Sequence, residues 1–257
     1  MSLYGHILPL VVVLVAWFTS TGAVAWLANR SKATFVRSIS WAGFAAGISL
    51  SVIVVSAHYP TVASAYVGFF AALVIWGWLE LTFLTGIITG PRRAESDPQA
   101  RGLRRFTDAA ATLIYHELAI AAVLVILVSL TWNTANLTGT IIFGLLFALR
   151  LSAKLNLYVG VPNMSDEIMP AHLVYLKSYF GPRRLHGALA LTLLAMVALS
   201  VWLGSLALAA PADSFAAVST SLVFGLAALG ALEHVFLALP FRDGALWRWA
   251  LPARQQG

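Results

Sequence analysis

Residues 7–32 have the sequence ILPLVVVLVAWFTSTGAVAWLANRSK, in which no charged side chain precedes Arg30 and Lys32. The apolar part, residues 7–28, is long enough to cross a hydrocarbon core about 30 Å thick, which requires about 20 helical residues. Six further runs have the same character. The sequence therefore predicts an all-α integral membrane bundle, a single domain over residues 1–257 with seven transmembrane helices at about 7–28, 39–57, 62–89, 108–131, 138–158, 187–210 and 215–239.

The 16 Lys and Arg residues occur only on alternate connections, when Arg150 and Lys154 are counted with the connection that follows their helix. The N-terminus and residues 58–61, 132–137 and 211–214 carry no basic residue. Basic residues that flank membrane spans stay on the cytoplasmic side. We therefore expect the N-terminus to lie outside and the C-terminus to lie in the cytoplasm.

The composition excludes several classes of protein. With 60% hydrophobic and 10% charged residues, the chain is too apolar for a soluble protein. Its net charge of +6 is explained by the topology signal and by attraction to anionic lipid head groups, so lipid and not nucleic acid is the expected partner. The absence of cysteine excludes disulfides and thiolate metal sites.

The fifth connection is expected to contain a short helix that lies in the head-group region. Asn163 or Ser165 can cap a new turn that carries Asp166 and Glu167, because acidic residues are favourable at a helix N-terminus. After Pro170, apolar and aromatic side chains recur at the spacing of an α-helix, a pattern typical of an interfacial helix: His172, Tyr175, Leu176 and Tyr179.

Ionisable residues inside the expected spans lie at one level of the membrane. With a helical rise of 1.5 Å per residue, the ionisable residues on four of the expected helices each lie roughly 12–17 Å from the inner end of their helix. Charges at this depth usually face the bundle interior or a water-filled cavity. They can form an ion network that fixes helix order, or a site for a ligand, metal or proton. The candidate ligand-binding or metal-binding residues are Glu80, His116, Glu117, His172, Glu233 and His234, with Arg150, Lys154 and Glu167 as charge partners.

These residue types allow two kinds of cofactor. Three glutamates with histidines match the ligands of a two-metal carboxylate centre, for instance with iron, although no Glu-x-x-His pattern is present. A tetrapyrrole would need one axial histidine, a cation for a propionate and apolar walls. His116, His234 or His172 could supply the ligand, and the walls could be Trp76, Trp78 and Phe83. A retinal protein is excluded because residues 215–239 contain no lysine for a Schiff base.

Several unusual strings carry a resemblance to a known family. They are WGWLE at 76–80, FLTG at 83–86, TGPR at 89–92, HELAI at 116–120, LRLSAKLN at 149–156, GVPN at 160–163 and P-x-HL-x-YL-x-SYF at 170–180. Together they resemble the PuhE family, seven-span photosynthetic complex assembly proteins of purple phototrophic bacteria. The resemblance covers residues 76–180 by these strings and the other spans by topology.

The resemblance implies a multi-pass protein of the bacterial inner membrane, cytoplasmic or intracytoplasmic. It implies a role in assembling the reaction-centre and antenna apparatus, linked to the supply of bacteriochlorophyll. Reaction-centre subunits, light-harvesting subunits or pigment-biosynthesis proteins would then be its partners. Two hypotheses stay open. The first is an assembly factor that binds bacteriochlorophyll or a precursor at the polar level. The second is a metal-dependent oxidoreductase that acts on a tetrapyrrole.

Overall fold

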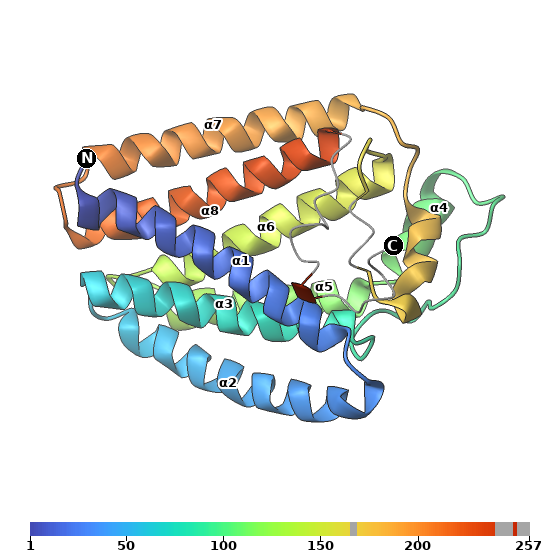
Figure 1. The fold of residues 1–257 in the computed structure, drawn as a ribbon, viewed down its shortest axis with the longest axis horizontal. Coiled ribbons are helices and arrows are strands. Elements are labelled where there is room, and N and C mark those ends of the chain that lie inside the picture. The colour runs from blue at the N-terminus through green and yellow to red at the C-terminus, as the bar shows by residue number, and fades with distance from the viewer. Residues whose placement is uncertain (165–168, 240–248, 251–257) are drawn as a thin grey trace.

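The chain folds into a bundle of long helices (Figure 1). The computed structural model describes residues 1–164, 169–239 and 249–250, and these residues contain helices and no strands. The α-helices are α1 Leu8–Ala28, α2 Phe35–Ser56, α3 Val62–Leu84, α4 Gly102–Ala110, α5 Ile114–Leu130, α6 Thr138–Val159, α7 Gly187–Ala209 and α8 Phe215–Ala238. Shorter elements are a π-helix η1 at Leu3–Ile7 and two 3₁₀ helices, η2 at Lys32–Thr34 and η4 at Ala171–Tyr179.

Six of these helices are long and apolar enough to cross a membrane: α1, α2, α3, α6, α7 and α8. The pair α4 and α5 adds a seventh span if it is counted as one bent segment. The prediction of an all-helical, multi-span bundle is therefore confirmed for the described residues. The bounds of five predicted spans agree with the helices to within four residues.

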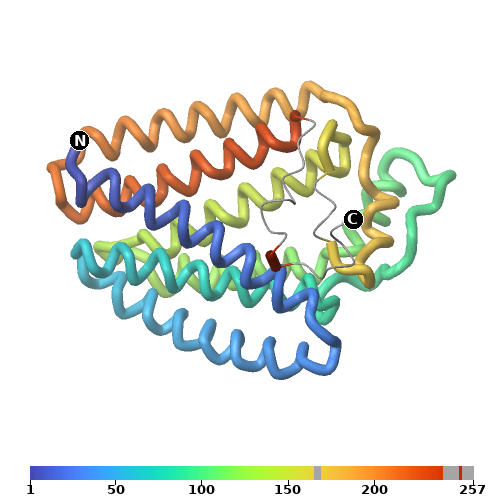
Figure 2. Tube along the Cα trace, viewed as in Figure 1, coloured from blue at the N-terminus to red at the C-terminus, as the bar shows by residue number. Residues whose placement is uncertain are grey.

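The connections differ between the two ends of the bundle (Figure 2). Short turns at residues 57–61, 131–137 and 210–214 lie near the N-terminus. The connections at residues 29–34, 85–101 and 169–186 lie at the opposite end and contain basic residues. We call this opposite end the basic end.

The predicted span 62–89 was too long, because α3 ends at Leu84. The next residues fold into a turn in which Gly86 adopts φ of 77°, a conformation that glycine tolerates best. The backbone N–H of Ile87 donates to the carbonyl of Thr82 at 3.0 Å, and the N–H of Gly86 donates to that of Phe83 at 2.8 Å. These hydrogen bonds satisfy carbonyl groups that the end of a helix leaves without partners, so local residues determine where α3 ends.

The predicted span 108–131 is not one helix, because α4 and α5 meet at a bend of 66°. The turn after α3 packs into the break. Arg92 donates its backbone N–H to the carbonyl of Ala111 at 3.1 Å, and His116 donates its own to the carbonyl of Thr89 at 3.1 Å. Non-helical partners therefore satisfy the backbone groups that the break exposes. The depth expected for Glu117 was calculated for a continuous helix over residues 108–131, and this assumption was wrong. Glu117 lies in the first turn of α5.

Helices α3 and α8 form the centre of the bundle. In each, 56% of the most apolar window is buried, against 17–28% in α1, α2, α6 and α7. Small residues allow neighbouring helices to approach closely. A Cβ on Gly230 of α8 would lie 2.5 Å from Leu149 of α6, and one on Gly225 would lie 3.1 Å from Leu10 of α1. The small residues of α8 thus allow α1 and α6 to pack beside it.

The fifth connection contains a 3₁₀ helix in place of the expected α-helix. Its buried residues are Leu173, Leu176 and Tyr179, which are three apart, the repeat of a 3₁₀ helix. The interfacial stripe predicted at α-helical spacing is therefore wrong in its period. Asn163 bonds the last turn of α8, since its backbone N–H donates to Leu237 O at 3.1 Å and its Nδ2 to Phe236 O at 3.0 Å. The proposed turn with Ser165, Asp166 and Glu167 lies outside the described residues.

Candidate functional site

Glu80 of α3 is the centre of a buried cluster of charged side chains. It is 8% exposed. Arg150 of α6 donates from its guanidinium to Oε2 of Glu80 at 3.4 Å. The other carboxylate oxygen, Oε1, lies 3.7 Å from Nε2 of His116 on α5, a residue with no exposed surface. Three candidates that are far apart in the sequence are thus brought together from three helices.

Lys154 and Glu117 form a second ion pair beside the first. Lys154 Nζ donates to Oε1 of Glu117 at 2.5 Å, and the two side chains are 14% and 12% exposed. Phe83 joins the pairs, because its ring stacks on His116 with centroids 4.7 Å apart and lies 5.3 Å from Lys154 Nζ. Both pairs therefore belong to one cluster.

The two ionisable candidates of α8 face different surroundings. Glu233 accepts a hydrogen bond from Nε1 of Trp17 on α1 at 2.9 Å. His234 has no exposed surface, and both ring nitrogens have partners. Nδ1 donates to the carbonyl of Gly230 at 2.8 Å, and Nε2 lies 3.1 Å from the hydroxyl of Ser152. His234 therefore links α8 to α6 through its hydrogen bond with Ser152.

His172 lies outside the cluster, in η4 at the basic end. Its ring is 6.2 Å from that of Phe35, and a Cβ on Gly86 would lie 3.1 Å from its Cδ2. Burial lowers the pKa of His172, and the positive charge of Lys32 lowers it further. The neutral imidazole therefore packs between the start of α2 and the turn after α3.

A cavity of about 330 Å³ adjoins the cluster. It lies among α1, α3, α6 and α8, and residues of the fifth connection line it at the basic end. Among the described residues, the charged ones that line it are Glu80, Arg150 and Glu233. The Arg150 side chain is 43% exposed, against 10% for its partner Glu80. The guanidinium therefore keeps accessible surface inside the bundle. Apolar and hydroxyl side chains form much of the remaining wall, among them Trp17, Ser20, Thr21, Trp76, Phe83 and Leu173.

The predicted aromatic walls are partly present. Trp76 and Phe83 line the cavity, but Trp78 does not. Trp78 faces α2, since a Cβ on Gly43 would lie 3.0 Å from its Nε1. Sequence reasoning missed Trp17, which both lines the cavity and holds Glu233. Its place in the middle of an apolar run, away from either membrane interface, was the available signal.

The described residues place neither a cluster of metal ligands nor a histidine in the lining of the cavity. Among the described residues, no group of three or more His, Asp or Glu side chains is placed to hold a metal ion. None of His116, His172 and His234 lines the cavity, so none is placed as an axial ligand for a tetrapyrrole within it. Arg150 does line the cavity, as a cation that holds a ligand would have to.

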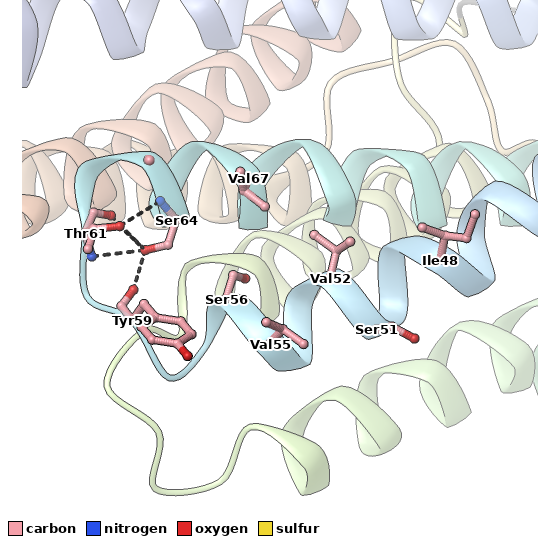
Figure 3. A pocket seen from close by; sticks show the side chains of 10 residues that line it. Ile48, Ser51, Val52, Val55, Ser56, Tyr59, Thr61, Ser64 and Val67 are labelled. Carbon is pink, nitrogen blue, oxygen red and sulfur yellow. Dashed lines mark hydrogen bonds between the residues drawn. The ribbon is translucent and has the colours of Figure 1, made fainter.

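A larger depression of about 630 Å³ lies between the C-terminal half of α2 and the N-terminal end of α3 (Figure 3). None of the described residues that line it is Asp, Glu, Lys, Arg or His. Thr61 caps α3 there: its hydroxyl accepts from the backbone N–H of Ser64 at 3.1 Å, and the Ser64 hydroxyl accepts from the backbone N–H of Thr61 at 3.0 Å. Volume alone would favour this depression, but it lacks charged groups. We therefore place the candidate site at the smaller cavity.

The fold and the cavity together define a multi-pass membrane protein with buried ion pairs beside a largely apolar cavity that contains a few charged side chains. The chain belongs to the family DUF3623, described as a protein of unknown function, whose model matches residues 3–257. It is 34% identical over 247 residues to a protein of Rhodobacter capsulatus named as an uncharacterized 30.4 kDa protein in the puhA 5′ region. That match covers 92% of this chain and 88% of the relative. No solved structure matches the chain.

Proposed function

We propose that this protein is an inner-membrane factor for assembly of the photosynthetic reaction-centre and antenna apparatus. In this proposal the protein binds bacteriochlorophyll or a precursor in the cavity beside Glu80 and Arg150 and so regulates the supply of pigment. The resemblance to the PuhE family supports this role. The name of the Rhodobacter capsulatus relative, which refers to the puhA 5′ region, supports it independently.

The observation that carries the binding role is the exposure of Arg150. An arginine at membrane depth is costly, and a purely structural one would be expected to bury its guanidinium among partners. Arg150 keeps 43% of its side chain exposed and lines a cavity with apolar walls. This combination of an apolar enclosure and a few polar groups is typical of a small-molecule site. The alternative is a metal-dependent oxidoreductase. It has less support, because the described residues contain no group of side chains placed to bind a metal ion.

The test is complementation of a purple bacterium that lacks the Rhodobacter capsulatus relative. Glu80→Gln and Arg150→Gln are introduced singly and together, and membrane abundance is measured beside assembled pigment–protein complex. Each single variant leaves one charge unpaired and should lower abundance. The double variant should accumulate near the wild-type level yet support little assembly, because the ligand contacts are lost.

Glu95→Ala, in the connection after α3, is the control and should change neither quantity. If abundance and assembly recover together in the double variant, the cluster is only a structural ion network. If the wild-type chain restores no assembly although it accumulates in the membrane, the proposed role in assembly is wrong.

A further inference from the structure

Helix α4 has one apolar face and one charged face, whereas the long helices are apolar on all sides. Leu103, Phe106 and Ala110 recur at i, i+3 and i+7 and therefore share a face. The charged side chains of the helix lie on the opposite face: Arg104, Arg105 and Asp108. A helix with this pattern and with arginine on its polar face is typical of the interface between a membrane and water.

The rest of the protein leaves the apolar face of α4 open. Leu103 is 76% exposed and Phe106 is 44% exposed. On the charged face, the side chain of Arg104 is 71% exposed, although it donates to Asp97 at 3.0 Å. Protein atoms therefore cover Leu103 and Arg104 to a similar, small extent. A difference between the surroundings of these two neighbours has to come from lipid.

The other side of α4 is attached to the basic end of the bundle (Figure 1). Arg105 lies 4.4 Å from the centre of the Tyr158 ring, near the end of α6, and donates to the carbonyl of Tyr179 in η4 at 2.9 Å. Phe106 contacts the same tyrosine ring edge-on, with centroids 5.7 Å apart. These contacts hold α4 at the level of the basic connections, which is the boundary of the membrane.

The direction of α4 agrees with a place on the membrane surface. Helix α5 has 17 residues, about 26 Å, and is long enough to cross the hydrocarbon core without α4. The bend of 66° between the two helices turns α4 away from the direction of α5 and toward the membrane plane. Residues 92–108, which include α4 and the chain before it, contain five arginines and three acidic residues. This excess of positive charge is complementary to anionic head groups.

We propose that α4 lies on the anionic phospholipid surface of the leaflet at the basic end. Leu103 and Phe106 insert between the acyl chains, and Arg101 and Arg104 contact head-group phosphates. Lipid at this place would hold the segment that leads into the break before α5, and therefore into the turn that carries Glu117. The proposal does not depend on the cavity or its ligand, so it can fail or succeed separately from the proposed function.

The test uses single cysteines, which the chain allows because it contains none of its own. Leu103→Cys and Arg104→Cys are labelled with a nitroxide in the full-length protein, in vesicles of equal parts phosphatidylcholine and phosphatidylglycerol. Collisions of the label with oxygen, which concentrates among acyl chains, are compared with collisions with a water-soluble nickel chelate. The ratio of oxygen to nickel collisions should be at least fivefold higher at position 103 than at position 104.

Two reference labels define the scale of that ratio. Val125→Cys lies on α5, where the side chain is 64% exposed, and reports the acyl chains. Gln99→Cys lies in the exposed connection before α4 and reports water. Position 103 should resemble position 125, and position 104 should resemble position 99.

A matched pair of double variants tests the role of the arginines, with the label at position 103. Arg101→Gln with Arg104→Gln should lower the collision ratio at least twofold, and vesicles of phosphatidylcholine alone should do the same to the unaltered helix. Arg183→Gln with Arg184→Gln removes a second exposed pair of arginines at the basic end and should leave the ratio unchanged.

Three results would overturn the proposal. A label at position 103 that resembles position 99 would place the apolar face of α4 in water, as a surface for a protein partner. Labels at 103 and 104 that both resemble position 125 would place α4 inside the hydrocarbon core as part of a span. A ratio that does not respond to phosphatidylglycerol, or that responds equally to both double variants, would exclude the contact between the arginines of α4 and anionic head groups.

Discussion

At the scale of single residues, two cations one turn apart on α6 have different roles. Lys154 is 14% exposed and closely paired with Glu117, whereas Arg150 is 43% exposed and has one long contact with Glu80. Both were expected to be charge partners in one cluster. The difference between them depends on which neighbouring helix each side chain meets. We therefore expect Lys154 to stabilise the fold and propose Arg150 as the residue that contacts a ligand.

The Lys154–Glu117 pair leads to a prediction about stability. Glu117→Gln should lower the free energy of unfolding by about 3–5 kcal/mol, because it leaves a buried ammonium group without its partner. Adding Lys154→Gln should restore most of the loss. Thermal unfolding of the purified protein in detergent measures the effect. Asp97→Asn breaks an ion pair with Arg104 whose side chains are 31% and 71% exposed, and it should cost less than about 1 kcal/mol. Equal losses for Glu117→Gln and Asp97→Asn would contradict the burial of the first pair.

At the scale of elements, the turn after α3 and the break before α5 support each other. Their backbones are joined by the Arg92–Ala111 and Thr89–His116 hydrogen bonds. Gly90 permits this approach, because a Cβ there would lie 2.1 Å from the carbonyl oxygen of Ala111. The connection is thus held at a fixed place beside His116. Tyr179 of η4 adds a further link, accepting from Nε of Arg92 at 2.6 Å and donating to Ala94 O at 3.0 Å.

A matched pair of glycine substitutions tests this contact. Gly90→Ala should destabilise the protein by about 1–3 kcal/mol or more, because backbone atoms cannot move away as a flexible side chain can. Gly47→Ala in α2 is the control, since a Cβ there would meet nothing within 4 Å. It should be neutral or stabilise by up to about 1 kcal/mol, because alanine restricts the unfolded chain. The melting temperatures of the two variants are compared. A melting temperature for Gly90→Ala equal to that of Gly47→Ala would show that the turn does not pack against the break.

At the scale of the whole molecule, the count of spans determines the topology. Helix α5 has 17 residues, which correspond to about 26 Å of helix, close to the thickness of a hydrocarbon core. It runs from the basic end to the opposite end, as the other long helices do (Figure 1). We therefore expect seven crossings, with the N-terminus outside and the basic end in the cytoplasm.

Reporter fusions test this topology. Fusions at Glu95 and at Gly257 should report a cytoplasmic location, and a fusion at Asp213 should report a periplasmic one. The reason is that basic residues flanking the spans remain in the cytoplasm. If α4 and α5 formed a re-entrant loop in place of a span, all later segments would exchange sides. A fusion at Asp213 that reports a cytoplasmic location while Glu95 does so as well would therefore contradict the seventh crossing.

The sequence by itself determined that the chain is a bundle of membrane-length helices with a polar level inside it. Both are local properties. An apolar run of about 20 residues is helical in a membrane whatever its neighbours are, and a fixed rise per residue sets how deep a charge lies. This is why Glu80 and Arg150 could be expected at similar depths before their contact was known, whereas the depth expected for His116 assumed a continuous helix that the break before α5 interrupts. The end of α3 at Leu84 was missed although its turn is formed by local hydrogen bonds, because the apolar run continues beyond it. The break before Ile114 was missed because it depends on hydrogen bonds to the turn after α3.

Only the tertiary structure decided which charges pair and which face the cavity. The long helices are apolar on all sides, so their sequences do not indicate which face points inward. The rotation of each helix is set by its neighbours, for example by Gly230 against Leu149 and by Trp17 against Glu233. Those contacts turn Trp78 toward α2, His234 toward Ser152 and Arg150 into the cavity. The candidate site is therefore a product of helix packing, because the sequence defines the level of each polar residue and packing defines its direction.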